Sequence, residues 1–288
     1  MNGIRRIFSA VFVVTLALGF ASAQQRAKLG ENAALRFWSA FAQMQDFAIT
    51  DQQAKELNLI LDGTAPYNDL KYKDLIEKNK PALETMARGT SILNCDWGVD
   101  YQLGPDAPVD YIRKSLAVGR LNVLYSFHLL INHDTDGAVR TLVAGLRFSH
   151  DVANGGTLFA AVSAKSLLVA HLRAVQFAVQ VDGLSAAQRL MLQKAVAQLG
   201  PDGLDWQSAV KQELEIPLGL DAKASAAMAQ IVPIYVSALN NPSILPKLEE
   251  MRAAGPQPLP DVIPNPRRVI EERQDLIDKL QQTRLKLQ

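Results

Sequence analysis

Residues 109–181 decide the fold, because they contain three helical segments joined by two short turns. The segments are VDYIRKSLAVGRLNVLYSFHLLIN (109–132), AVRTLVAGLRFSHDV (138–152) and LFAAVSAKSLLVAHLRAVQFAVQV (158–181). In each, apolar side chains recur every three or four residues, which is the spacing of one face of an α-helix. Turns as short as HDTDG (133–137) join antiparallel neighbours. We therefore expect three packed antiparallel helices at the centre of the chain.

All four histidines of the chain lie in this stretch: His128, His133, His150 and His171. At about 1.5 Å of rise per residue, His128 and His171 lie at similar heights on neighbouring helices, whereas His150 lies at the opposite end. Two histidines do not complete a zinc site without a third ligand. The sequence therefore predicts no metal and no cofactor. It favours histidines that pack in the core, with a His128–His171 pair as the open alternative.

The longest non-helical segment of the first half, 90–108, holds the only cysteine, within Asn94-Cys95-Asp96-Trp97-Gly98. Long irregular segments in compact domains are often functional. The spacing of the aspartates does not fit a calcium-binding EF-hand loop. In the alternative interpretation, the cysteine and the tryptophan plug the helical core and the aspartates cap helices or face water. The candidate ligand-binding residues are Cys95, Asp96, Trp97, His128 and His171.

The first 23 residues have the pattern of a secretory signal peptide. A basic start with Arg5 and Arg6 precedes an apolar run, and the run ends in Ala21-Ser22-Ala23. Retention of this segment as an anchor is the alternative. No later stretch is expected to span a bilayer, which requires about 20 apolar residues. We therefore expect an exported protein, periplasmic or extracellular, without a membrane span after cleavage.

The 288 residues carry 30 basic and 29 acidic side chains, a net charge of +1. Loss of the two arginines of the leader changes this charge to −1. A nearly neutral chain does not indicate nucleic acid as a partner. A single cysteine cannot form an intrachain disulfide, so packing has to hold the exported chain together.

The mature chain is predicted to be all-α, with antiparallel helical hairpins packed as a solenoid-like or orthogonal bundle. One helical domain is expected over 24–254, followed by an extended proline-rich linker, GPQPLPDVIPNP, at 255–266. Residues 267–288 form an amphipathic helix with a heptad-like apolar stripe. Docking of this helix on the domain, or self-association as a coiled coil, is favoured over a free tail because the stripe is apolar. Contact with a protein partner is a further alternative. Other helices are expected at 32–44, 51–61, 67–78 with a restart at Pro81, 185–198, 206–216, 221–239 and 243–254.

Three features together resemble an uncharacterised group of exported, all-helical proteins of environmental bacteria. They are Asn32-Ala33-Ala34-Leu35 with Trp38 and Ala40-Phe41, then Cys95-Asp96-Trp97-Gly98, and then the histidine-bearing helical pair that follows. The resemblance implies export and an all-helical fold, and it carries no catalytic residues. The helical hairpins are also similar to tetratricopeptide repeats in architecture, although the W-x2-L-G-x2-Y signature is absent.

The sequence contains no glycine-rich phosphate loop, no G-x-S-x-G and no H-E-x-x-H motif. Glu213 and Glu215, two apart on a helix, point in different directions and do not form an acid–base pair. The first hypothesis is a non-catalytic binding or scaffold protein of the cell envelope. The second is an enzyme or small-ligand binder with a pocket near Cys95, Trp97, His128 and His171. The absence of catalytic motifs favours the first hypothesis over an enzyme, and both hypotheses stay open.

Overall fold

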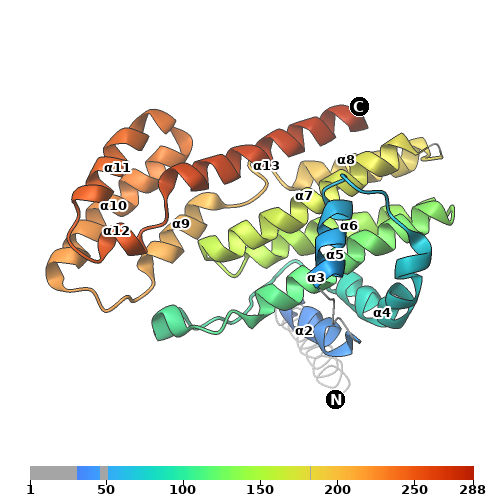
Figure 1. The fold of residues 1–288 in the computed structure, drawn as a ribbon, viewed down its shortest axis with the longest axis horizontal. Helices are drawn as coiled ribbons and strands as arrows, with labels where there is room; N and C mark the ends of the chain where they lie inside the picture. Colours follow the sequence, from blue (N-terminus) through green and yellow to red (C-terminus); the bar gives the residue numbers. More distant parts are fainter. Residues whose placement is uncertain (1–30, 46–50, 182) are drawn as a thin grey trace, which may run out of the picture.

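The computed structural model describes residues 31–45, 51–181 and 183–288, and within them every regular element is a helix. The predicted all-α class is confirmed. The predicted signal peptide lies outside the described residues. Figure 1 shows the helices in an elongated arrangement, with the lobe of α9–α12 at one end of the long axis.

Three long helices form the centre, as the apolar pattern predicts: α5 (Asp110–Ile131), α6 (Thr135–Ala153) and α7 (Leu158–Gln180). The Asp134 side chain accepts a hydrogen bond from the first turn of α6, and the Thr157 side chain does the same for α7. These caps satisfy backbone N–H groups that have no partner inside a helix. The three helices pack on one another and bury most of their apolar side chains.

The N-terminal helices cover one side of this centre: α2 (Ala33–Gln43), α3 (Asp51–Leu61) and α4 (Asp69–Gly89). Helix α2 packs on α4, and α4 packs on α5. The prediction of a restart at Pro81 is wrong, because α4 continues through it. Nearby, Asn79 is fully buried, and its amide donates to the carbonyls of Gln45 and Leu75 at 3.0 and 2.9 Å. This buried side chain ties the middle of α4 to the end of the α2 segment.

The second half adds shorter helices. Three of them begin at side-chain caps, Ser185, Asp205 and Asp221. Helix α10 continues through Pro233. The α-helices are α8 (Ala186–Gln198), α9 (Trp206–Glu215), α10 (Ala222–Asn240), α11 (Leu245–Ala254) and α12 (Leu259–Val262), and the 3₁₀ turns are Tyr101–Asp106 and Pro242–Ile244.

The segment 255–266 is not extended as expected, because it contains α12 and buries Leu259 and Ile263. Apolar side chains between the prolines fold the segment against the chain. The last helix, α13 (Pro266–Leu287), then runs back along α7 and α8 (Figure 1). Its buried face contains Val269, Leu276, Leu280, Thr283 and Leu287. Docking, one of the alternatives that the sequence leaves open, is therefore present within a single chain.

Two helices, α7 and α10, are long and apolar enough to cross a membrane by length and composition. The expectation that no stretch after residue 23 reaches this threshold is therefore not met. In the most apolar window of α7, 67% of the residues are buried inside the protein, compared with 33% in α10. Helix α7 is apolar because other helices surround it in the centre of the fold.

Candidate ligand-binding site

His171 lies fully buried in α7, with hydrogen-bond partners at both ring nitrogens. Its Nδ1 lies 2.9 Å from the Leu167 carbonyl oxygen and 3.1 Å from the Ser149 hydroxyl, and Nε2 lies 3.0 Å from the Asn122 amide. Burial lowers the pKa of His171 to about 4, so the ring is neutral at pH 7. The neutral ring carries one N–H: at Nε2 it donates to Asn122 Oδ1, and at Nδ1 it donates to the Leu167 carbonyl oxygen, so the tautomer sets which bond forms. These bonds identify His171 as a structural residue.

Gly145 of α6 makes room for this contact between α5 and α7. A Cβ atom at position 145 would lie under 3.0 Å from His171 Nε2 and from Asn122 Oδ1. Residues 122, 145, 149 and 171 are called the polar knot below. The knot joins the three central helices around a glycine.

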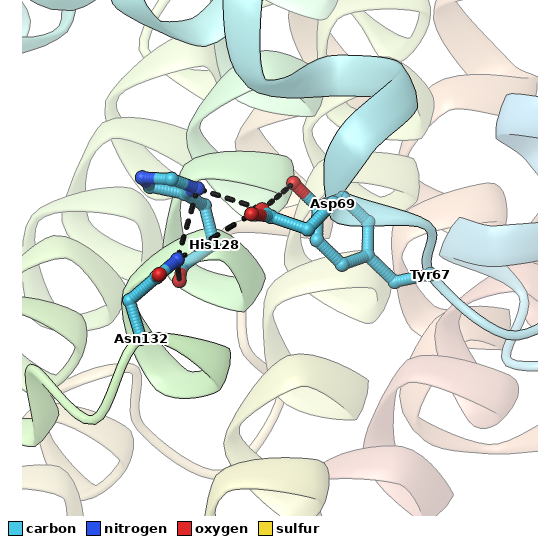
Figure 2. A network of polar contacts seen from close by, with 4 residues as sticks. All are labelled: Tyr67, Asp69, His128 and Asn132. Atoms are coloured by element: carbon cyan, nitrogen blue, oxygen red, sulfur yellow. Dashed lines mark hydrogen bonds and ion pairs between the residues drawn. The ribbon is translucent and has the colours of Figure 1, made fainter.

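His128 belongs to a different network, shown in Figure 2. Its Nδ1 lies 2.6 Å from Asp69 Oδ1, and the same carboxylate accepts a bond from the Tyr67 hydroxyl at 3.0 Å. Asn132 donates to Asp69 Oδ2 at 3.5 Å and to the carbonyl of His128 at 2.8 Å. Burial raises the pKa of Asp69, but the bonds from His128, Tyr67 and Asn132 outweigh this effect and lower it overall. The network fastens the start of α4 to the end of α5.

The structure separates the two histidines that the sequence places at similar heights. His171 faces Asn122, which precedes His128 by less than two turns of α5, whereas His128 faces Asp69 on α4. Among the described residues, no serine, threonine or cysteine is hydrogen-bonded to His128. The Asp69–His128 pair therefore lacks the adjacent nucleophile that a catalytic triad requires.

Cys95 and Trp97 plug the core, as the alternative interpretation of the 90–108 segment states. The Trp97 indole donates to the Asp151 carbonyl oxygen at 2.8 Å, and the Cys95 sulfur lies 3.8 Å from the same oxygen. The Trp97 ring stacks on Tyr111 with centroids 4.3 Å apart. Burial, Asp151 and Asp96 all raise the pKa of Cys95. The thiol therefore stays protonated and unreactive at neutral pH.

Asp96 is exposed and closes the turn between these two buried side chains. Its carboxylate accepts a bond from the Gly98 backbone at 2.8 Å. The Asn32 amide donates to the Asp96 carbonyl oxygen at 2.6 Å, and the Asn32 side-chain oxygen accepts from the Asp96 backbone at 2.9 Å. Asp96 thus anchors the loop to the start of α2.

A cavity of about 370 Å³ opens beside this plug, between α6, α8 and the start of the loop. A site at this place is not among the predictions from the sequence, although Arg147, His150 and Asp151 follow the i, i+3, i+4 spacing of one helix face. This space is called the α6–α8 cavity below. It is lined by Leu93, Val143, Leu146, Arg147, His150, Asp151, Asn154, Ala195, Gln198 and Leu199.

The electrostatics of the α6–α8 cavity differ from those of the polar knot. Asp151 is only 6% exposed, and its Oδ2 has no hydrogen-bond partner among the described residues. Burial raises the pKa of Asp151 to about 7, although Arg147 acts to lower it. Burial and Arg147 both lower the pKa of His150. Within the described ranges, Arg147 forms no ion pair. The cavity lining therefore includes a cation without an ion pair and a buried carboxyl group whose Oδ2 has no hydrogen-bond partner, both among the described residues.

Two larger cavities contain fewer charged or polar groups that lack a partner. In one, of about 470 Å³, Lys165 pairs with Glu272 at 2.7 Å and Arg173 pairs with Asp62 at 2.8 Å. The other, of about 580 Å³, lies between residues 214–220 and α10, and most of its lining is apolar. Internal ion pairs satisfy most charges of the first, and the second offers few groups that could orient a ligand.

Comparison of the chain with protein-family models, characterised proteins and solved structures finds no match. The described part of the chain contains no group of three or more histidine, cysteine, aspartate or glutamate side chains that could hold a metal ion. The functional assignment therefore depends on the geometry and charge of the α6–α8 cavity.

Proposed function

We propose that the protein is a non-catalytic binding protein of the cell envelope that takes a small ligand into the α6–α8 cavity. The observation that carries the proposal is the pair of Asp151 and Arg147 in the cavity lining, since among the described residues Asp151 Oδ2 has no hydrogen-bond partner and Arg147 has no ion pair. An unsatisfied buried polar group costs about 1–3 kcal/mol of stability. Perturbed, uncompensated groups in a cavity are typical of binding and active sites.

Three features support binding over catalysis. The Cys95 thiol is buried with a raised pKa, the ring of His171 is enclosed by structural bonds, and the Asp69–His128 pair has no described nucleophile beside it. The second candidate is an enzyme that uses Asp151 as a general acid or base. The pKa of about 7 at Asp151 favours this candidate, because proton transfer is most efficient near the working pH.

The location in the envelope depends on the leader-like residues 1–23. Cell fractionation with N-terminal sequencing tests this part of the proposal. We expect a mature chain that begins at Gln24 in the exported fraction, and a chain that keeps Met1 in the cytoplasm would contradict it.

A scaffold role through α13 is a separate part of the proposal. The apolar side of this helix packs on α7 and α8, so its outer face, which carries Arg268, Glu271 and Gln274, remains for a partner. Truncation after Gly255 tests the internal role of the helix. We expect a lower unfolding temperature, because the truncation uncovers apolar surface of α7 and α8.

Filling the α6–α8 cavity tests ligand binding directly. Ala195 lines the cavity from α8, whereas Ala197 on the same helix is exposed and lies outside it. Wild type and the variants Ala195→Phe and Ala197→Phe would be isolated under native conditions from the envelope of the producing cells and measured by native mass spectrometry. We expect a small-molecule adduct on wild type and on Ala197→Phe, and none on Ala195→Phe. An adduct on all three proteins, or on none, would contradict the proposal.

A further inference from the structure

We propose that the ligand of the α6–α8 cavity is a small apolar α-amino acid, with its carboxylate at Arg147 and its ammonium group at Asp151. This inference rests on the proposed function and names the ligand class for the same site. The cavity volume of about 370 Å³ is near the lower end of the range for ligand pockets, which is about 300–1,000 Å³. The site therefore suits a small molecule.

The charges of the site match a zwitterion. Arg147 and Asp151 are four residues apart on α6, so they point to the same side of the helix, yet they form no ion pair with each other. A guanidinium group binds a carboxylate through two parallel N–H donors. A carboxylate accepts the N–H donors of an ammonium group. An α-amino acid carries both groups on one carbon, so one ligand can satisfy both side chains.

Ligands with a single charge fit less well. A monocarboxylate on Arg147 would approach the Asp151 carboxyl group and leave it without a donor when it is ionised. A simple amine on Asp151 would bring a second cation close to Arg147. Like charges at short range oppose binding. Only a ligand with both charges leaves neither side chain unmatched.

The remaining lining selects the side chain of the ligand. Val143, Leu146, Ala195 and Leu199 form apolar walls, and Leu93 stands at the edge with 87% of its surface exposed. A ligand with a branched apolar side chain covers Leu93 and fills this part of the cavity, and burial of such surface favours binding. A ligand without a side chain gains nothing from these walls.

Four probes, each differing from leucine in one feature or none, test the inference by isothermal titration calorimetry. The sample is the mature chain, which is first unfolded and refolded to remove bound molecules. The probes are L-leucine, glycine, 4-methylpentanoate and 3-methylbutylamine. The last two share the branched side chain of leucine but carry only the carboxylate or only the ammonium group. We expect leucine to bind, and each of the other three to bind at least tenfold more weakly.

Variants test whether Arg147 binds the carboxylate of leucine and Asp151 binds its ammonium group. Arg147→Met should weaken leucine binding at least tenfold and remove the preference for leucine over 3-methylbutylamine. Asp151→Asn should remove the preference for leucine over 4-methylpentanoate. Arg140→Met is the matched control, because Arg140 is exposed on the same helix outside this cavity, and it should bind leucine like wild type. Circular dichroism would verify that each variant is folded.

Two outcomes would overturn the inference. One is binding of 4-methylpentanoate or 3-methylbutylamine as tight as that of leucine, and the other is no binding of leucine by folded wild type. If Ala195→Phe still abolishes a native adduct of another chemical class, the ligand class is wrong while the binding function stands. If no adduct depends on the cavity, the proposed function fails together with the ligand class.

Discussion

Buried polar groups on the two sides of α6 differ in whether they have hydrogen-bond partners. Towards α5 and α7, the polar knot around Gly145 and Ser149 gives both ring nitrogens of His171 a partner. Towards α8 and the Cys95 loop, Asp151 Oδ2 has none among the described residues. Burial shifts the pKa of both groups, to about 4 for His171 and about 7 for Asp151, but only the knot compensates by hydrogen bonding. A satisfied buried group indicates structure, and an unsatisfied one in a cavity indicates a site for something else.

The largest expected effect is at the centre of the knot. Gly145→Ala places a methyl group under 3.0 Å from His171 Nε2 and Asn122 Oδ1, so these two side chains have to move apart. Overpacking costs about 1–3 kcal/mol, and a buried polar group left without a partner costs about 1–3 more. We expect the free energy of unfolding, measured with urea, to fall by about 2–6 kcal/mol.

A double-mutant cycle with His171→Ala sharpens this prediction. The shorter side chain removes the clash, so Gly145→Ala should cost less in the His171→Ala background than in wild type. If Gly145→Ala lowered the free energy of unfolding equally in both backgrounds, contact with His171 would not be the reason that position 145 requires glycine.

The next expected effect is that the contributions of His171 and Asp151 to the free energy of unfolding depend on pH in opposite directions. The folded-state pKa of His171, about 4, lies below its ordinary value of 6.5, so its contribution to stability is lost as pH falls from about 6.5 towards 4. The folded-state pKa of Asp151, about 7, lies above its ordinary value of 3.8. Its contribution is therefore complete below pH 3.8 and is lost as pH rises from there towards 7.

Asp151→Asn separates the two contributions, because asparagine does not ionise. Relative to wild type, this variant should gain roughly 2–4 kcal/mol in unfolding free energy between pH 4 and pH 8, since one pKa unit corresponds to about 1.4 kcal/mol. Urea unfolding at both pH values measures this change. A difference that stays constant with pH would place the ionisation of Asp151 at an ordinary pKa, and the contrast between the two sides of α6 would be lost.

The smallest expected effect is on the plug beside the cavity. Trp97→Phe keeps an aromatic ring against Tyr111 but loses the bond from the indole to the Asp151 carbonyl oxygen. A net cost of about 1 kcal/mol in unfolding free energy is expected for one such bond. Trp38→Phe is the matched control, because the Trp38 indole donates no hydrogen bond among the described residues and should cost less. Equal losses would show that ring size, not the bond, stabilises the loop.

The sequence predicted the helices well because the signals for them are local. The segments 109–132, 138–152 and 158–181 differ from α5, α6 and α7 by at most three residues at either end. Apolar spacing marks the buried face of each helix, and the side chains of Asp134 and Thr157 cap the helices that follow them. Neither signal depends on a residue far away in the chain.

The structure does not bring the candidate site residues together. Cys95 and Trp97 pack in the core and are not among the residues that line the α6–α8 cavity. His128 and His171 turn to Asp69 and Asn122, which are 59 and 49 residues away. Helical height indicates which residues are level and not which way their side chains point.

The sequence by itself determined the helices, their caps and the central position of the three long segments, because short-range periodicity and backbone capping set these features. Only the tertiary structure decided that His171 is enclosed by hydrogen bonds and that Asp151 is not. Both side chains are polar groups on apolar helices, and a helix sequence does not distinguish them. The difference is whether a neighbouring helix brings a partner to the buried group or leaves a cavity beside it, and packing between distant segments sets that choice.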